Sequence, residues 1–332
     1  MKTERETERG WEHSPRSVLP TMERVRSLVR NALPERDVIG VELLSGGNRN
    51  SNLLVELRHA APIVLRIYRS GEAGTARREA ALLRLLADVV PVPRVLHVDA
   101  SETLELPFVM MERVEGVRLE HRLSGGDDDA ELGANVGGVL ARIHAIQLPV
   151  AGWFDPELQT ITPFGESDGW FAFIRKTLDE GQAAQRLGRD VAARLRTLLD
   201  RHPHALDGFV DAPCLLHADF KPANLLIRVE RPAVAAVLDW EFAFSGPALF
   251  DLAIMLRHEE EMPPRYVSAM LESYQSERGP LPEGWRTAAR LLDLVNLCDL
   301  ANRPYDAPRM YADIRCVVAS SLQQLERAAL LR

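Results

Sequence analysis

The hydrophobic period of this 332-residue chain changes about a third of the way along, and the change limits the folds open to it. Short apolar runs with strand-like composition, separated by turn residues, dominate residues 38–111. Beyond residues 112–116 most apolar side chains recur at helical spacing. The pattern predicts an α+β chain with a small antiparallel β-sheet lobe, a short hinge and a large, mainly helical lobe.

The N-terminal lobe is expected over residues 18–112. A helix over 19–33 comes first, and a second helix ending before Pro91 is inserted after the third strand. Residues 1–17 mix acidic and basic side chains with few apolar anchors, so we expect a disordered tail there. The expected strands are 38–44, 52–57, 63–68, 95–98 and 107–111.

The C-terminal lobe, residues 113–332, is expected to be mostly helical. Two apolar strand runs, 214–227 with an interrupting motif and 234–240, predict a hairpin at its inner edge. The expected helices are 129–147, 170–187, 190–202, 249–257, 264–278, 284–301 and 308–331.

Overall charge and cysteine usage exclude several classes of protein. The chain has 40 basic and 48 acidic residues, a net charge of −8, so the basic footprint of a nucleic-acid binder is missing. Its three cysteines form no paired framework, which suits a reducing compartment. Without a signal sequence or an apolar run of about 18 residues, the expectation is a soluble, cytoplasmic protein with no membrane contact and no evident obligate protein partner.

The chemistry is carried by a motif in the hairpin. His217, Asp219 and Asn224 follow the spacing H-x-D-x-x-x-x-N, and Asp239 comes at the end of the next strand. Phosphoryl transfer uses this arrangement: the first carboxylate takes the proton of the acceptor hydroxyl, while the Asn and the second Asp hold Mg²⁺ on the nucleotide phosphates. The alternative is an ordinary strand-turn-strand in which the same residues serve turn chemistry.

Lysine is scarce, and this makes one arginine conspicuous. The lysines are Lys2, Lys176 and Lys221, and none lies on the third strand, where protein kinases carry their phosphate-binding lysine. Arg66 is there instead, and we expect it to bind phosphate with Glu79 of the next helix as its ion-pair partner. The alternative is a solvated strand residue. For Lys221, a role near the transferred phosphate and a solvated loop charge remain equally open.

The first turn of the sheet is a weaker candidate for a phosphate site. No G-x-G-x-x-G is present, but small and amide residues follow the first strand, and their backbone N–H groups are suited to phosphate oxygens. The residues of this expected cofactor-binding turn are Ser45, Gly46, Gly47 and Asn48.

The two stretches 216–226 and 237–252 resemble the signatures of the aminoglycoside phosphotransferase and choline kinase family. The likeness extends over roughly 38–274. It implies a protein-kinase-like bilobal fold, ATP or possibly GTP as phosphoryl donor, and Mg²⁺.

Residue by residue, the likeness implies roles for the motif and its surroundings. Asp219 is the implied catalytic base, His217 and Lys221 are expected as further catalytic residues beside it, and Asn224 and Asp239 are the implied Mg²⁺ ligands. Asp251 is implied to hold the catalytic hairpin by hydrogen bonds. The hinge residues Met111 and Glu112 are implied nucleotide contacts, and Glu241 is a second acidic residue whose part in metal or substrate binding is open.

The acceptor site is expected in the helical lobe. Asp293, Asn296 and Asp299 recur at i, i+3 and i+6 on an otherwise apolar helix, so they share a face and are candidates to contact a cationic acceptor. The alternative is that this polar stripe is the outward side of the helix, and that the run Glu259–Glu261 is likewise a solvated charge run.

The acceptor class follows from the likeness and from a missing segment. Only eleven residues separate Asp239 from Asp251, without D-F-G or A-P-E, so a peptide-docking activation segment is not expected. An aminoglycoside-type antibiotic is the first choice. A metabolite alcohol such as choline, homoserine or a sugar is the alternative, and a catalytically silent nucleotide-binding regulator is a second.

Overall fold

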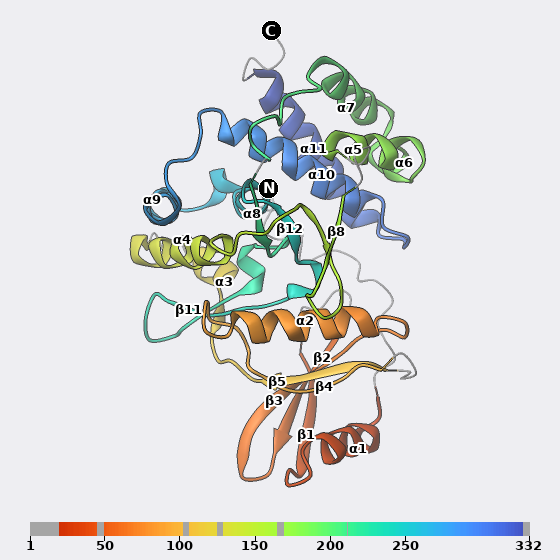
Figure 1. Ribbon diagram of the computed structural model, residues 1–332, viewed down its shortest axis with the longest axis vertical. Helices are drawn as coiled ribbons and strands as arrows, with labels where there is room; N and C mark the ends of the chain where they lie inside the picture. The colour runs from red at the N-terminus through yellow and green to blue at the C-terminus, as the bar shows by residue number, and fades with distance from the viewer. Residues whose placement is uncertain are drawn as a thin grey trace.

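The computed structural model describes residues 20–44, 50–101, 106–124, 129–164, 169–210 and 212–327. The expected tail, 1–17, and the expected phosphate turn of Ser45, Gly46, Gly47 and Asn48 lie outside these ranges. A sheet with helix α1 occupies one end of the molecule and most of the helices occupy the other, with α2 between them (Figure 1).

The N-terminal sheet has the predicted five antiparallel strands, in the order β1-β2-β3-β5-β4. As expected, one helix, α2, follows the third strand. The elements are α1 (Met22–Ala32), β1 (Val38–Leu43), β2 (Ser51–Leu57), β3 (Ala60–Ile67), α2 (Ala73–Leu86), β4 (Val95–Asp99) and β5 (Phe108–Glu112).

Strand β3 separates the two faces of this sheet, because successive side chains of a strand point to opposite sides. Ile63, Leu65 and Ile67 are buried in one apolar cluster with Val25 and Val29 of α1.

Arg66 of β3 and Tyr68, which directly follows the strand, belong to the other face of the sheet. Tyr68 is buried in the second, larger cluster together with the apolar side of α2, and Arg66 is only 5% exposed. Strand alternation therefore turns Arg66 toward α2 and the helical lobe.

The helical lobe contains one break that the sequence pattern did not indicate. The stretch 170–187, predicted as one helix, forms α5 (Trp170–Asp179) and α6 (Ala183–Leu187). Between them the backbone N–H of Gln182 donates to Oδ1 of Asn302, 2.7 Å away. A distant side chain thus binds the backbone at the break between the two helices. The other helices of this lobe are α3 (Leu119–Ser124), α4 (Ala130–His144), α7 (Arg189–Arg201), α8 (Leu249–Met255), α9 (Pro264–Arg278), α10 (Trp285–Ala301) and α11 (Pro308–Arg327).

Two small sheets line the inner edge of this lobe. The predicted hairpin is present as β10 (Leu225–Ile227) and β11 (Val234–Val237), and β6 (Val117–Arg118) pairs with β10. A four-stranded sheet of order β8-β7-β12-β9 was not predicted as such. Its strand β9 begins the predicted run 214–227, but the other three strands were missed because they are only three or four residues long and show no clear alternation. Its members are β7 (Gly152–Phe154), β8 (Ile161–Pro163), β9 (Pro213–Leu216) and β12 (Phe244–Pro247).

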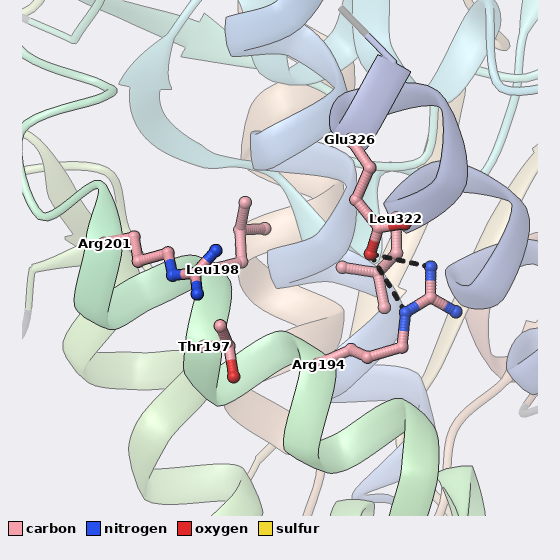
Figure 2. A pocket seen from close by; sticks show the side chains of 6 residues that line it. All are labelled: Arg194, Thr197, Leu198, Arg201, Leu322 and Glu326. Atoms are coloured by element: carbon pink, nitrogen blue, oxygen red, sulfur yellow. Dashed lines mark hydrogen bonds and ion pairs between the residues drawn. The ribbon is translucent and has the colours of Figure 1, made fainter. Parts of the chain in front are cut away.

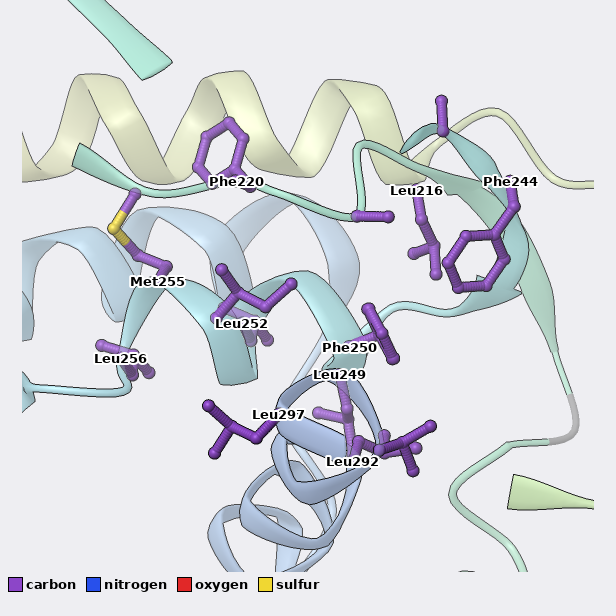
Figure 3. Close-up of a cluster of buried hydrophobic side chains, with 14 of the residues drawn as sticks. Leu216, Phe220, Phe244, Leu249, Phe250, Leu252, Met255, Leu256, Leu292 and Leu297 are labelled. Carbon is purple, nitrogen blue, oxygen red and sulfur yellow. The ribbon is translucent and has the colours of Figure 1, made fainter. Parts of the chain in front are cut away.

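The loop between β9 and β10, which carries Asp219, is supported on one side by apolar packing. Figure 3 shows Leu216, Phe220 and Phe244 above Leu252 and Phe250 of helix α8, and that helix in turn lies against α10. These side chains are at most 5% exposed, so the loop rests on a closed core. In the described part of the chain, none of the helices combines the length and apolar character needed to traverse a bilayer.

Candidate active site

The loop after β9 carries the first part of the motif and is held in a strained conformation. Ala218 has φ = 63°, a left-handed value that costs free energy for a residue with a Cβ. Asp251, fully buried at the start of α8, accepts hydrogen bonds from the backbone N–H groups of His217 and Ala218, at 2.8 and 2.7 Å. Asp251 thus holds the backbone of the loop after β9 by hydrogen bonds, which is the role that the family likeness implies.

Asp251 is itself oriented by a buried histidine that the sequence did not single out. His144 of α4 is completely buried, with Nε2 3.2 Å from Asp251 Oδ2 and Nδ1 2.9 Å from the Tyr274 hydroxyl of α9. Burial raises the pKa of that tyrosine. The chain from Tyr274 through His144 to Asp251 connects two helices to the loop.

Asp219 lies at the open side of the same loop. Its carboxylate Oδ2 accepts from Asn224 Nδ2 at 2.8 Å, and its Oδ1 lies 3.2 Å from Lys221 Nζ. The Asp219 side chain is 25% exposed. Three of the residues singled out in the sequence therefore meet around one accessible carboxylate.

His217 differs from the expectation that it acts directly in catalysis. Its side chain is completely buried, and its ring is tilted against the Trp240 ring with 4.6 Å between the ring centroids. Nδ1 accepts from the Asp219 backbone N–H at 3.2 Å, which leaves Nε2 to donate to the Leu238 carbonyl at 2.7 Å. With both ring nitrogens bonded to backbone, His217 positions the loops that carry Asp219 and Asp239.

Asp239 begins the turn after β11 with φ = 63°. One of its oxygens pairs with Arg66 Nη1, and its side chain is 27% exposed. Burial alone would raise the pKa of Asp239, but the Arg66 guanidinium outweighs this and lowers it below the ordinary value. Asp239 is therefore ionised.

Arg66 joins the two lobes through carboxylates. The predicted pair is present, with Arg66 Nε 3.1 Å from Glu79 Oε2, and Arg66 Nη2 lies 3.2 Å from Glu241 Oε1. Burial alone would lower the pKa of Arg66, but the charges of Glu79 and Asp239 outweigh it and raise the pKa well above its usual value. Burial raises the pKa of Glu79, which also accepts from the Tyr68 hydroxyl.

One polar residue of this cluster was missed in the sequence. Asn50, 5% exposed at the start of β2, donates from Nδ2 to Glu241 Oε2 at 3.2 Å. The two residues are 191 positions apart, so no local pattern connects them. The sequence signal for Asn50 is that it belongs to the stretch 45–51 of small and amide residues after the first expected strand, although it was not among the expected phosphate contacts.

The implied hinge contacts lie at the end of β5. Met111 is opposite Val64 of β3, so it shares the sheet face of Arg66, and it is 7% exposed. Glu112 pairs with Arg94 on the surface, where the hydrogen bond to Glu112 raises the pKa of Arg94. Of the two, only Met111 is directed toward the inter-lobe side.

The residues of the polar stripe of α10 are bonded to arginines. Asp293 is 4% exposed, and both its oxygens accept from Arg257, which follows α8. Arg257 Nη2 also donates to Asn296 Oδ1 at 2.8 Å. Asp299, about half exposed, pairs with Arg303 at 2.8 Å. The outward position offered as the alternative is wrong for Asp293, because Arg257 covers it. Contact of this stripe with an acceptor stays a prediction.

A surface depression of about 190 Å³ lies elsewhere, between α7 and α11 (Figure 2). Arg194 crosses it to pair with Glu326 at 2.8 Å. None of the residues singled out in the sequence lines it. Its lining residues are Arg194, Thr197, Leu198, Arg201, Leu322 and Glu326.

Comparison with known proteins agrees with this geometry. Residues 40–291 match the phosphotransferase enzyme family, APH. A mouse protein, acyl-CoA dehydrogenase family member 10, is 28% identical over 225 residues. That match covers 64% of this chain but only 20% of the mouse protein, so the chain spans about a fifth of this relative's length.

Solved structures confirm the predicted kinase-like fold. A proposed aminoglycoside phosphotransferase from Ralstonia eutropha has a TM-score of 0.69 at 16% identity, covering 92% of this chain and 98% of that one. A thermostable mutant of APH(4)-Ia with AMP-PNP and hygromycin B has a TM-score of 0.67 at 20% identity, with the same coverage. Aminoglycoside 2'-phosphotransferase-IIIa with GDP has a TM-score of 0.66 at 17% identity over 92% and 99% of the two chains.

Proposed function

The chain belongs to the phosphotransferase enzyme family, and from this premise we propose that it moves the γ-phosphoryl group of ATP to a hydroxyl group of a small molecule. The observation that carries the proposal is the convergence of Asp219, Asn224 and Asp239 with Arg66 between the two lobes. Each of these groups has a distinct task in phosphoryl transfer.

Asp219 is proposed to take the proton of the acceptor hydroxyl. Its carboxylate is partly exposed, and Asn224 and Lys221 fix its orientation. A positioned carboxylate of this kind contributes about 10²–10⁴-fold to rate. Lys221 is proposed to neutralise charge on the transferred group, and Arg66 is proposed to bind the nucleotide phosphates with its guanidinium.

The charges of the cluster fit a magnesium ion. Four carboxylates, of Glu79, Asp219, Asp239 and Glu241, converge with two cations, Arg66 and Lys221, so negative charge is in excess. Mg²⁺ takes one or two carboxylates and completes its shell with phosphates and water, so a small number of protein ligands is enough to hold it.

Asn224 and Asp239 are the residues proposed to hold that ion. When bound, Mg²⁺ supplies positive charge to the phosphate oxygens and orients the nucleotide for attack. The protein's own part is to keep the Asp239 carboxylate ionised, through Arg66, and to hold the Asn224 amide against Asp219.

The acceptor is proposed to be a hydroxyl-bearing small molecule. An aminoglycoside-type antibiotic is the first choice because the similar folds include aminoglycoside phosphotransferases, one of them solved with hygromycin B. A metabolite alcohol is the second candidate. Among choline, homoserine and a sugar, the uncharged sugar is the one favoured by the contacts of Arg257 with Asp293 and Asn296, because these contacts leave both groups paired with a protein cation and not with a cationic substrate.

The test is ADP release with a panel of aminoglycosides, choline, homoserine and sugars, measured with and without Mg²⁺. Asp219→Asn is the test variant, because it removes the negative charge of the side chain and keeps its size. We expect Mg²⁺-dependent turnover with at least one acceptor and a loss of about 10²–10⁴-fold in Asp219→Asn with nucleotide affinity retained.

A silent regulator would give a different result. It would bind ATP, release no ADP above background with any acceptor or with water, and show the same behaviour after Asp219→Asn. That outcome would overturn the catalytic proposal.

A further inference from the structure

Arg66 is held at all three nitrogens of its guanidinium. Nε faces Glu79 and Nη2 faces Glu241, at 3.1 and 3.2 Å, and both carboxylates are less than 8% exposed. Nη1 faces Asp239, whose side chain is 27% exposed. Nε forms an ion pair with Glu79 without hydrogen-bond geometry, whereas Nη2 donates a hydrogen bond to Glu241 and Nη1 donates one to the more exposed Asp239. Glu241 is therefore the closed partner that sets the orientation of the planar group.

This arrangement suits an arginine and not a lysine. An ammonium is a compact charge on a flexible stem, and a single carboxylate is enough to hold it in place. A guanidinium is a rigid planar fork, and one carboxylate on Nε leaves its other edges free to swing. A second carboxylate on Nη2 removes that freedom and directs Nη1.

Glu241 is well placed to be this second carboxylate. It belongs to the turn Trp240–Phe242, which is anchored by the completely buried Trp240, whose indole N–H donates to the Val237 carbonyl at 3.1 Å. Its other oxygen, Oε2, accepts from Asn50 at 3.2 Å. The orientation of the Glu241 carboxylate is therefore set from both lobes.

We propose that Glu241 is a positioning residue that fixes the guanidinium of Arg66, in a role needed because this chain carries an arginine at the phosphate-binding position, and that Asn50 orients Glu241. The inference rests on the proposed function, because it assumes that Arg66 meets nucleotide phosphates. It assigns Glu241 to the arginine and not to the acceptor.

A double-mutant cycle tests the dependence on arginine. ATP dissociation constants are measured by calorimetry in EDTA and again in Mg²⁺ for the parent, Glu241→Gln, Arg66→Lys and the double variant. Gln keeps the shape of Glu and removes its charge. We expect Glu241→Gln to weaken ATP binding about 10-fold with Arg66 present and less than about 3-fold with Lys at position 66, since coupled neighbours are not additive.

Equal fold losses in the two backgrounds would overturn the inference. Glu79→Gln is the matched control, because a lysine also needs this partner, and it should remain costly in both backgrounds. If the parent itself binds no ATP, the proposed function fails instead, and the two failures are distinguishable.

Asn50→Ala is a milder second variant that leaves the charge of Glu241 in place. We expect a loss of about 3-fold in ATP affinity with Arg66 and none with Arg66→Lys. Thermal unfolding separates this from a folding defect, since all variants should unfold within a few degrees of their backgrounds. An effect of Asn50→Ala that is the same in both backgrounds would contradict its assigned role.

Discussion

Arg66 and Arg257 are both closed off from solvent, with side chains 6% exposed, and both are bonded to carboxylates, but their partners come from different parts of the molecule. Arg257 holds Asp293 and Asn296, which lie on consecutive turns of one helix. Arg66 reaches Glu79 on α2 and Asp239 and Glu241 on the turn after β11. One cluster is internal to a lobe, and the other connects two lobes.

The carboxylates of the two clusters differ in solvent exposure, and this indicates different roles for the clusters. Asp293 is closed on both sides, with a side chain 5% exposed, whereas Asp239 keeps 27% of its side chain exposed. A buried pair that nothing else can reach stabilises or specifies a fold. A cluster with excess negative charge and one accessible carboxylate is arranged to receive a cation and phosphates.

Removing one carboxylate from each cluster should give the largest contrast. Asp293→Ala leaves the Arg257 charge buried, and we expect the free energy of unfolding to fall by about 3–5 kcal/mol. Asp239→Ala should cost less than about 1 kcal/mol, because Arg66 keeps Glu79 and Glu241. Urea unfolding measures both.

A second variant checks the cause of the Asp293 effect. Replacing the pair together, by Arg257→Met with Asp293→Leu, should restore most of the lost stability, since the uncompensated charge is gone. Equal costs for Asp239→Ala and Asp293→Ala would contradict the distinction between the clusters.

The rate of cysteine labelling should change less than the stability does. It reports on the packing around β9, which carries Cys214, and around α10, which carries Cys298. Burial raises the pKa of Cys214 in β9 and of Cys298 in α10 to about 12 each. At pH 8 only about 10⁻⁴ of such a thiol is the reactive thiolate. Exposed Cys316 should therefore react first with a thiol reagent, in a labelling time course followed by mass spectrometry.

The variants should shift this pattern selectively. Asp293→Ala loosens the packing of α10, so labelling of Cys298 should become faster, while Cys214 stays protected in Asp239→Ala. Labelling of Cys298 as fast as that of Cys316 in the parent would show that α10 is not closed around Arg257.

The sequence predicted contacts between residues that are close together in the chain, and it did not predict contacts between distant residues. The pair of Arg66 with Glu79 was predicted because the third strand and the helix after it are neighbours in the sequence. The motif of Asp219 and Asn224 was correct as a cluster because its members are five residues apart. The contacts of Asn50 with Glu241 and of His144 with Asp251 span more than a hundred residues. Without a periodic or spacing signal, such contacts appear only in the fold.

The error at Asp293 has the same origin. Spacing on a helix shows which residues share a face, but it does not show what that face meets, and Arg257 lies on another element. Likewise, Asn302, about 120 residues away, binds the backbone at the break between α5 and α6. Helical periodicity continues through the break, so the pattern alone predicted one helix.

We expect Arg66 to bind the nucleotide phosphates and Arg257 to stabilise the helical lobe. The ATP affinities of two matched variants distinguish these roles most directly. Met removes the charge and keeps much of the side-chain length, so Arg66→Met and Arg257→Met are compared with the parent by calorimetry. We expect Arg66→Met to weaken ATP binding about 10- to 100-fold, the range for hydrogen bonds to a charged group. We also expect folded Arg257→Met to bind like the parent. Parent-like ATP affinity in Arg66→Met would contradict the role proposed for Arg66.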